Sequence, residues 1–126
     1  LAAALSDLVA TLRAAGIEVT LEVPEDADLP AATEALFYRI AQEAIRNARR
    51  HAEPSHVDIE LADVDSAARF SIKDDGRGFS SASAPGDQEQ RHFGLRLMRD
   101  LVDHAGGRLE VISAPGEGTC ITVWMP

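Results

Sequence analysis

Three polar side chains, those of Glu43, Asn47 and Arg50, recur at helical spacing in the central part of the chain. At 100° per residue they fall within about 60° of one another, beside an apolar stripe of the same helix. The amide oxygen of Asn47 suits Mg²⁺, which takes oxygen ligands and is often held jointly by the protein and substrate phosphate. Alternatively, Glu43 pairs with an arginine of its own helix (Arg39, Arg46 or Arg50) and Asn47 acts as a cap. A second, complementary segment is needed to decide between the two.

The second segment is 74–79, Asp-Asp-Gly-Arg-Gly-Phe, which follows a run with strand periodicity. Gly76 and Gly78 permit backbone angles closed to other residues and let a ligand ring approach the main chain. A carboxylate before such a turn, here that of Asp74, can accept a hydrogen bond from an exocyclic amine, as adenine presents. The alternative is an ordinary acidic β-turn, because Asp-Gly pairs are common there. In this order, the two segments together predict an ATP site without a Walker loop.

A third candidate is a helix start at Gly94 and Leu95, after a polar segment (80–92) that we expect to be a functional or disordered loop. A helix N-terminus led by glycine offers free N–H groups and a positive dipole end to phosphate. His92, just before it, is either a ligand or a surface residue. Thr119, which begins a strand, either hydrogen-bonds into a pocket or lies in a turn.

Hydrophobic periodicity predicts the elements that position these residues. Helices are expected over 1–15, from 30 to about 51, and over 94–105. Strands are expected over 17–23, 57–61, 68–72, 109–111 and 121–125, with a hairpin turn at 63–66. This order predicts an α+β fold, a two-layer sandwich whose mixed sheet of about five strands is covered on one face by three helices.

Composition narrows the class of protein. With 126 residues, the chain is long enough for one domain (1–126) with a single core. A net charge of −9 argues against nucleic acid as a partner, and no apolar run approaches the ~20 residues that span a bilayer. The single cysteine, Cys120, excludes a disulfide framework and fits a cytoplasmic setting. Because the chain begins at Leu1 rather than Met, we expect it to be a piece of a longer protein.

Taken in order, these segments resemble the catalytic ATP-binding domain of sensor histidine kinases, within the wider ATPase group of gyrase, MutL and the heat-shock chaperone (GHKL, Bergerat fold). Residues 43–52 are similar to its N-box, 74–79 to its G1 box and 116–123 to its closing segment. The segment 92–99 is similar to the G2 region of the nitrate-sensor-like subfamily, whose members pair with LuxR-type DNA-binding regulators.

The resemblance implies a role for each candidate. Asn47 would coordinate Mg²⁺, Asp74 would bind the adenine amine, and Glu43 would be the catalytic residue that positions water or metal near the γ-phosphate. Residues 80–93 would form an ATP lid hinged near Gly94. The other implied contacts to ATP are Arg50, His51, Gly76, Gly78, Phe79, His92, Gly94, Leu95 and Thr119. Many relatives carry Lys in place of Arg50. At this position the chain therefore has a planar guanidinium group where those relatives have a compact ammonium group.

The resemblance also implies that the chain donates the γ-phosphoryl group of ATP to a histidine on a separate dimerisation segment, and that it serves a LuxR-type response regulator indirectly. An acidic residue follows the phosphorylated histidine in that segment. None of the four histidines here (His51, His56, His92 and His104) has that context, so we expect the acceptor outside this chain. The isolated domain would then be a monomer with little activity and no direct contact with nucleic acid or membrane.

Three other functions are consistent with parts of the sequence. An anti-sigma factor of the serine-kinase type has related N, G1 and G2 boxes at similar length, although the leading helix and the strand at 17–23 argue against it. A second alternative is a nucleotide-binding module without transfer activity, against which the intact Glu43, Asn47, Asp74 and glycines argue. A plain α+β interaction module would carry all four motifs by chance.

Overall fold

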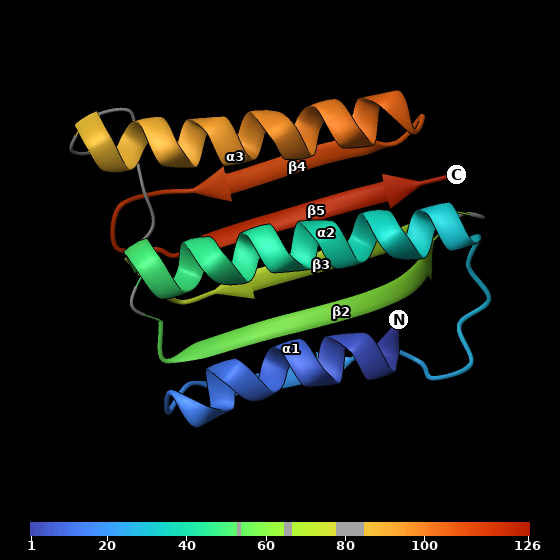
Figure 1. Ribbon diagram of the computed structural model, residues 1–126, viewed down its shortest axis with the longest axis horizontal. Helices are drawn as coiled ribbons and strands as arrows, with labels where there is room; N and C mark the ends of the chain where they lie inside the picture. Colours follow the sequence, from blue (N-terminus) through green and yellow to red (C-terminus); the bar gives the residue numbers. More distant parts are fainter. Residues whose placement is uncertain (53, 65–66, 78–84) are drawn as a thin grey trace.

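The computed structural model describes residues 1–52, 54–64, 67–77 and 85–126, and it arranges them in two layers (Figure 1). The helical layer consists of α1 (Ala2–Ala14), α2 (Ala31–Asn47) and α3 (Pro85–His104), with the π-helical η1 (Ala48–Ala52) continuing α2. The strands are β1 (Glu18–Glu22), β2 (His56–Val64), β3 (Ala67–Asp74), β4 (Arg108–Ser113) and β5 (Thr119–Met125). Within the described residues, the predicted α+β sandwich of five strands and three helices is confirmed.

The sheet has the strand order β1-β2-β3-β5-β4. β1 pairs with β2 in parallel, and the other neighbours are antiparallel, so the sheet is mixed. β3 is flanked on both sides, and its last residue, Asp74, pairs with Val57 of β2 and with Thr119 of β5. The topology thus brings the end of β3 and the beginning of β5 together, although they lie far apart in the sequence.

The core lies between the sheet and the helices. Alternation along β3 buries Ala68, Phe70 and Ile72 on the helical side, and the same alternation places Asp74 on that side. The ring of Phe37 on α2 stacks on that of Phe70, with centroids 4.9 Å apart. Burying each of these rings contributes about 1.5–3 kcal/mol. The stacked rings therefore hold α2 against β3, four residues before Asp74.

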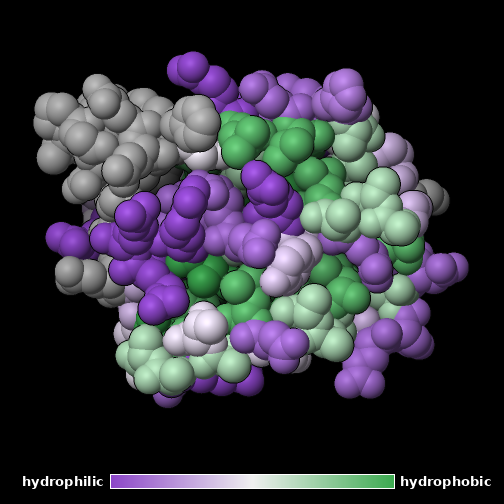
Figure 2. All heavy atoms as spheres, in the orientation of Figure 1, coloured by the Kyte–Doolittle hydropathy of each residue, from purple (hydrophilic) through white to green (hydrophobic). Residues whose placement is uncertain are grey.

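The surface of the helical layer follows from this packing. Hydrophilic side chains form a band along the middle of that face, where α2 lies, and hydrophobic side chains flank the band on both sides (Figure 2). The exposed arginines of α2 and η1 include Arg46, Arg49 and Arg50. Among the helices of the described segments, none is both long enough and apolar enough to cross a membrane.

The beginning of α3 differs from the prediction. The helix starts at Pro85, so the expected loop over 80–92 is wrong for residues 85–92, and residues 80–84 lie outside the described residues. The apolar pattern could not reveal these first turns, because residues 85–92 carry no large apolar side chain. Proline is favoured at the first helical position, since its missing N–H needs no partner there. That signal was available in the sequence.

Candidate functional site

The adenine side of the candidate site is the end of β3. The side chain of Asp74 is buried, and its Oδ1 accepts a hydrogen bond from the amide N–H of Gly76 at 2.9 Å. Burial raises the pKa of Asp74, while hydrogen bonds from the backbone at Gly76 and Thr119 act in the opposite direction. A carboxylate has about four acceptor positions, so this group can also accept a hydrogen bond from an exocyclic amine.

Gly118, just before β5, packs against the backbone of Asp74, a contact that the sequence did not reveal. Its φ is +76°, and a Cβ built on it would lie 2.1 Å from the carbonyl oxygen of Asp74. A side chain at this position would therefore collide with main chain rather than with a movable side chain. The signal in the sequence was the Gly-Glu-Gly turn before β5, which the structure shows to contact the end of β3. In the same turn, Gly116 donates its amide N–H to the carbonyl oxygen of Arg77 at 2.6 Å.

Thr119 begins β5 opposite Asp74. Its half-buried hydroxyl lies 2.9 Å from that of Ser113, whose Oγ also donates to the carbonyl oxygen of Gly118 at 3.0 Å. Gly76 is buried, as expected of a glycine that shapes a pocket floor. The structure thus brings together three predicted adenine-side residues, whereas Gly78 and Phe79 lie outside the described residues.

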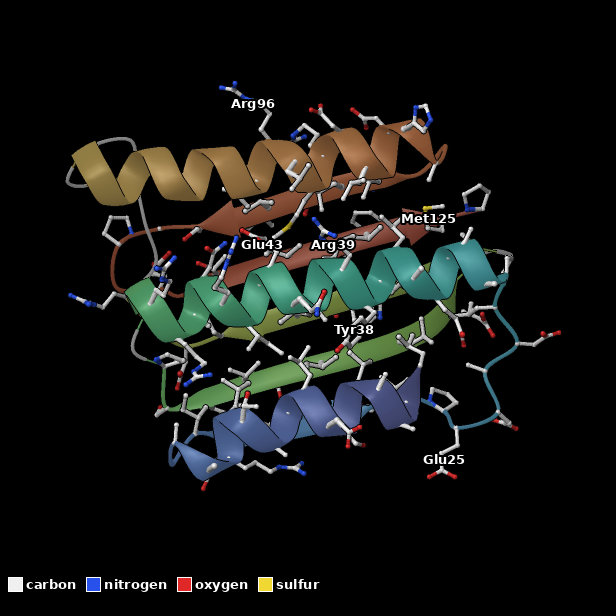
Figure 3. The ribbon with its side chains drawn as sticks, in the orientation of Figure 1. Glu25, Tyr38, Arg39, Glu43, Arg96 and Met125 are labelled. Atoms are coloured by element: carbon white, nitrogen blue, oxygen red, sulfur yellow. The ribbon has the colours of Figure 1, made fainter. Side chains whose placement is uncertain are left out.

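The phosphate side lies on the helices. Glu43 extends from α2 toward the side on which α3 lies (Figure 3), and its side chain is 12% exposed. Its Oε1 accepts a hydrogen bond from Nη2 of Arg46 at 2.6 Å, so Arg46 is the partner among the three arginines that the spacing allowed. A Cβ built on Gly94 would lie 2.2 Å from Oε1 of Glu43. The absence of a side chain at 94 therefore lets the carboxylate approach α3.

Gly94 itself lies inside α3, which corrects the prediction of a helix N-terminus there. Because the helix begins at Pro85, the N–H of Gly94 belongs to the helix interior, where backbone donors bond to the preceding turn. It is not one of the free donors that a phosphate could use. Leu95, next to it, is partly buried against the core. His92 lies in the same helix, and its side chain is outside the description.

Asn47 is the last residue of α2, where the helix passes into η1. Its side chain is half-buried and makes no hydrogen bond with the described part of the chain. Short π-helical segments are frequent at functional sites. The amide oxygen of Asn47, without a hydrogen bond to the described residues, and the carboxylate of Glu43 one helical turn earlier form a donor set that fits Mg²⁺. Within the described segments, no cluster of three His, Cys, Asp or Glu side chains could hold a metal ion.

The arginines at the end of α2 adjoin a groove of about 420 Å³ between α1 and α2. Leu8 and Thr11 of α1 line one wall, and the α2–η1 wall includes Arg46 and Arg50. Arg50 therefore borders the groove beside α1, whereas Glu43 faces α3. Contrary to the prediction from α-helical spacing, the two residues do not share one face. The wider turn of η1 changes the angular position of residues after Asn47. His51 also lies in η1, and its side chain is not described.

Comparison with known proteins identifies the family of this chain. Residues 32–126 match the family described as "Histidine kinase-, DNA gyrase B-, and HSP90-like ATPase". The chain belongs to this family. The matched region contains all of the candidate site residues, from Glu43 to Thr119, while α1 and β1 precede it.

Proteins that resemble the chain in sequence include sensor kinases. The sensor protein VraS of Staphylococcus saprophyticus is 32% identical over 125 residues, which are 97% of this chain and 34% of that protein. The signal transduction histidine-protein kinase/phosphatase DegS of Brevibacillus brevis is 32% identical over 97 residues, 77% of this chain and 24% of that protein. The chain thus spans about a quarter to a third of the length of these relatives.

A solved structure shares the fold of this ATPase-family chain. The histidine kinase domain of the blue-light activated histidine kinase EL346 from Erythrobacter litoralis superposes with a TM-score of 0.76 at 23% identity, over 97% of this chain and 58% of that one. At this level of identity the likeness establishes the fold alone. The predicted membership of the histidine-kinase ATPase family is confirmed by the family match over residues 32–126.

Proposed function

We propose that this chain binds Mg-ATP and donates the γ-phosphoryl group to a histidine on a separate dimerisation segment of a two-component signalling kinase. The observation that carries the proposal is the buried carboxylate of Asp74 beside the turn at Gly76. A buried carboxylate is costly unless it has partners, and the adenine amine supplies one. Thr119, Gly78 and Phe79 complete the proposed adenine pocket.

At the phosphate end, Asn47 is proposed to hold Mg²⁺, and Glu43 to position water or the metal near the γ-phosphate. When bound, the metal would neutralise phosphate charge, which is the main requirement of phosphoryl transfer besides positioning. Arg50 and His51 are proposed to contact the phosphates. Two observations support this arrangement: the amide of Asn47 makes no hydrogen bond with the residues that the structure describes, and Glu43 lies close to α3.

Three residues of α3 complete the proposed ATP contacts. His92 and Leu95 are proposed to lie along the nucleotide, and Gly94 to act by admitting the Glu43 carboxylate to this part of the helix. The short separation between Glu43 Oε1 and the Cβ position of Gly94 supports the last role.

The properties of the whole protein are proposed from its relatives. We assign the parent to the nitrate-sensor-like subfamily, on the segment 92–99, and expect it to serve a LuxR-type response regulator indirectly. The dimerisation helices that carry the acceptor histidine would be its direct partner. The domain, 1–126, would be cytoplasmic and monomeric in isolation, without direct contact with nucleic acid or membrane, in keeping with its net charge of −9.

Calorimetric titration with a non-hydrolysable ATP analogue and Mg²⁺ tests the proposal. Folded wild-type protein should bind the analogue, Asp74→Asn should lose binding, and Asn47→Asp should change the Mg²⁺ dependence of binding. Transfer of labelled phosphate to an added dimerisation segment from a related kinase then tests the second half of the proposal. Binding without any transfer would favour a nucleotide-binding module, and no binding by folded wild-type protein would refute the ATP site.

A further inference from the structure

Asp75 joins the end of β3 to the beginning of β2. Its Oδ1 accepts hydrogen bonds from the amide N–H groups of Ser55 and His56, at 2.8 and 2.9 Å. Its Oδ2 accepts a hydrogen bond from the hydroxyl of Ser55 at 2.6 Å. Its own amide N–H donates to the carbonyl oxygen of His56 at 3.3 Å. These bonds keep the pKa of Asp75 low, so the group stays ionised at neutral pH.

These bonds lie directly beside the backbone that carries the Asp74 carboxylate. Asp74 is the last residue of the β3 ladder. Among the residues that the structure describes, the 3.3 Å backbone bond of Asp75 and its side-chain bonds continue the attachment to β2. On the β5 side, Gly118 lies against the carbonyl oxygen of Asp74. The peptide that joins residues 74 and 75 is thus held from both neighbouring strands.

We propose that Asp75 is a positioning residue: its bonds to Ser55 and His56 fix the backbone that aims the Asp74 carboxylate, and so determine the preference for adenine over a base without the 6-amino group. This inference rests on the proposed function, because it requires that Asp74 bind the adenine amine. Asp75 itself is exposed and bonded to β2, so it acts through the main chain rather than by touching the nucleotide.

The alternative is that Asp75 merely stabilises the pairing of β2 and β3. The same strand pair offers a matched control farther along the ladder, where Nη2 of Arg69 donates to Oε1 of Glu60 at 2.7 Å. Both links join β2 to β3 through a carboxylate, but only Asp75 adjoins Asp74. Removal of either link should lower stability, and removal of the Asp75 link alone should alter base preference.

The test compares the affinities for the β,γ-imido analogues of ATP and of inosine triphosphate, whose base has a 6-oxo group, by calorimetry with Mg²⁺. In Asp75→Ala, affinity for the ATP analogue should fall about tenfold and affinity for the inosine analogue less than about twofold. The reason is that only the contact with the 6-amino group depends on the orientation of the Asp74 carboxylate. Asp75→Asn keeps an oxygen that can accept from both N–H groups. Its ratio of ATP-analogue affinity to inosine-analogue affinity should therefore stay within about threefold of the wild-type ratio. Arg69→Ala should keep the wild-type ratio.

Equal losses for both analogues in Asp75→Ala, or a changed ratio in Arg69→Ala, would overturn the inference. If Asp75→Ala does not fold, Ser55→Ala replaces it, since that variant removes only the 2.6 Å bond. Its ratio should fall about twofold, and an unchanged ratio would overturn the inference. Failure of wild-type protein to bind the ATP analogue would refute the proposed function itself, whereas binding with no preference over the inosine analogue would refute only the role of the Asp74–Asp75 pair.

Discussion

The adenine side of the candidate site lies at the ends of three hydrogen-bonded strands, whereas the phosphate side lies on the helices α2 and α3 and on η1. At Asp74, neighbouring strands and the Gly118 turn fix both the side chain and its backbone. At Asn47, the amide has no hydrogen bond with the described residues, and Glu43 is held by an exposed arginine.

The difference has a physical origin. A strand ladder satisfies backbone groups and sets register at once, so side chains at strand ends are positioned before a ligand arrives. Side chains on adjacent helices gain their positions from packing alone, and charged ones near the surface stay mobile unless paired. We infer that the base site is preorganised and that the phosphate site takes its final arrangement only with nucleotide and metal present.

The largest expected effect concerns the preorganised side. In Asp74→Asn, affinity for the ATP analogue should fall at least about 100-fold, because an amide N–H₂ replaces the acceptor oxygen that faces the adenine amine. The raised pKa of Asp74 means that its contribution to folding stability is present at low pH and is lost as the pH rises through the folded pKa. The variant should therefore unfold at pH 7 with an equal or greater free energy, as urea denaturation would measure.

The same carboxylate predicts how binding varies with pH. Wild-type affinity for the ATP analogue should decline as the pH falls through the raised pKa of Asp74, beginning above the ordinary value of 3.8. Calorimetry of the wild-type protein over a pH series measures this, and circular dichroism at each pH checks that the protein stays folded. A wild-type profile without such a decline would show that the ionised carboxylate of Asp74 does not contribute to nucleotide binding.

Two glycines of one turn test whether main-chain contact makes the base side rigid. Gly118→Ala should cost about 2–4 kcal/mol, since the new Cβ meets the carbonyl of Asp74 and φ is +76°. Gly116→Ala has nearly the same φ of +80° but no atom within 4 Å of the new Cβ, and should cost about 1 kcal/mol. Urea denaturation of both variants gives the difference, and equal costs would contradict the close contact.

Gly94→Ala is the matched test on the phosphate side. The three described atoms nearest to its new Cβ all belong to the flexible Glu43 side chain, and alanine has a higher helix propensity than glycine, so stability should change by less than about 1 kcal/mol. The displaced carboxylate should nevertheless lower the rate of phosphoryl transfer with little change in ATP-analogue affinity. A large loss of stability would show that this side is as rigid as the other.

The smallest effect is expected for the ion pair between Glu43 and Arg46. Arg46 is 57% exposed, so Arg46→Ala should change the free energy of unfolding by no more than about 0.5 kcal/mol. Thermal denaturation at low and high salt measures this. A loss above about 1 kcal/mol would mean that the pair holds the phosphate side in place in the free domain.

The sequence by itself determined the class of fold and the local position of most candidate residues. Alternating apolar residues before Asp74 predict the strand, and the stripe through Leu36 and Ile40 predicts the buried face of α2. Both patterns report local geometry, in which each residue's direction depends on its near neighbours. The fold class and the family were predicted for that reason.

Only the tertiary structure decided which residues meet. It paired Asp74 with Thr119, set Gly118 against the backbone of Asp74 and joined Asp75 to Ser55, because β3 lies between β2 and β5. It also began α3 at Pro85, in a stretch whose polar residues carry no apolar period. Strand order arises from packing the whole sheet beneath three helices, and no local pattern encodes it.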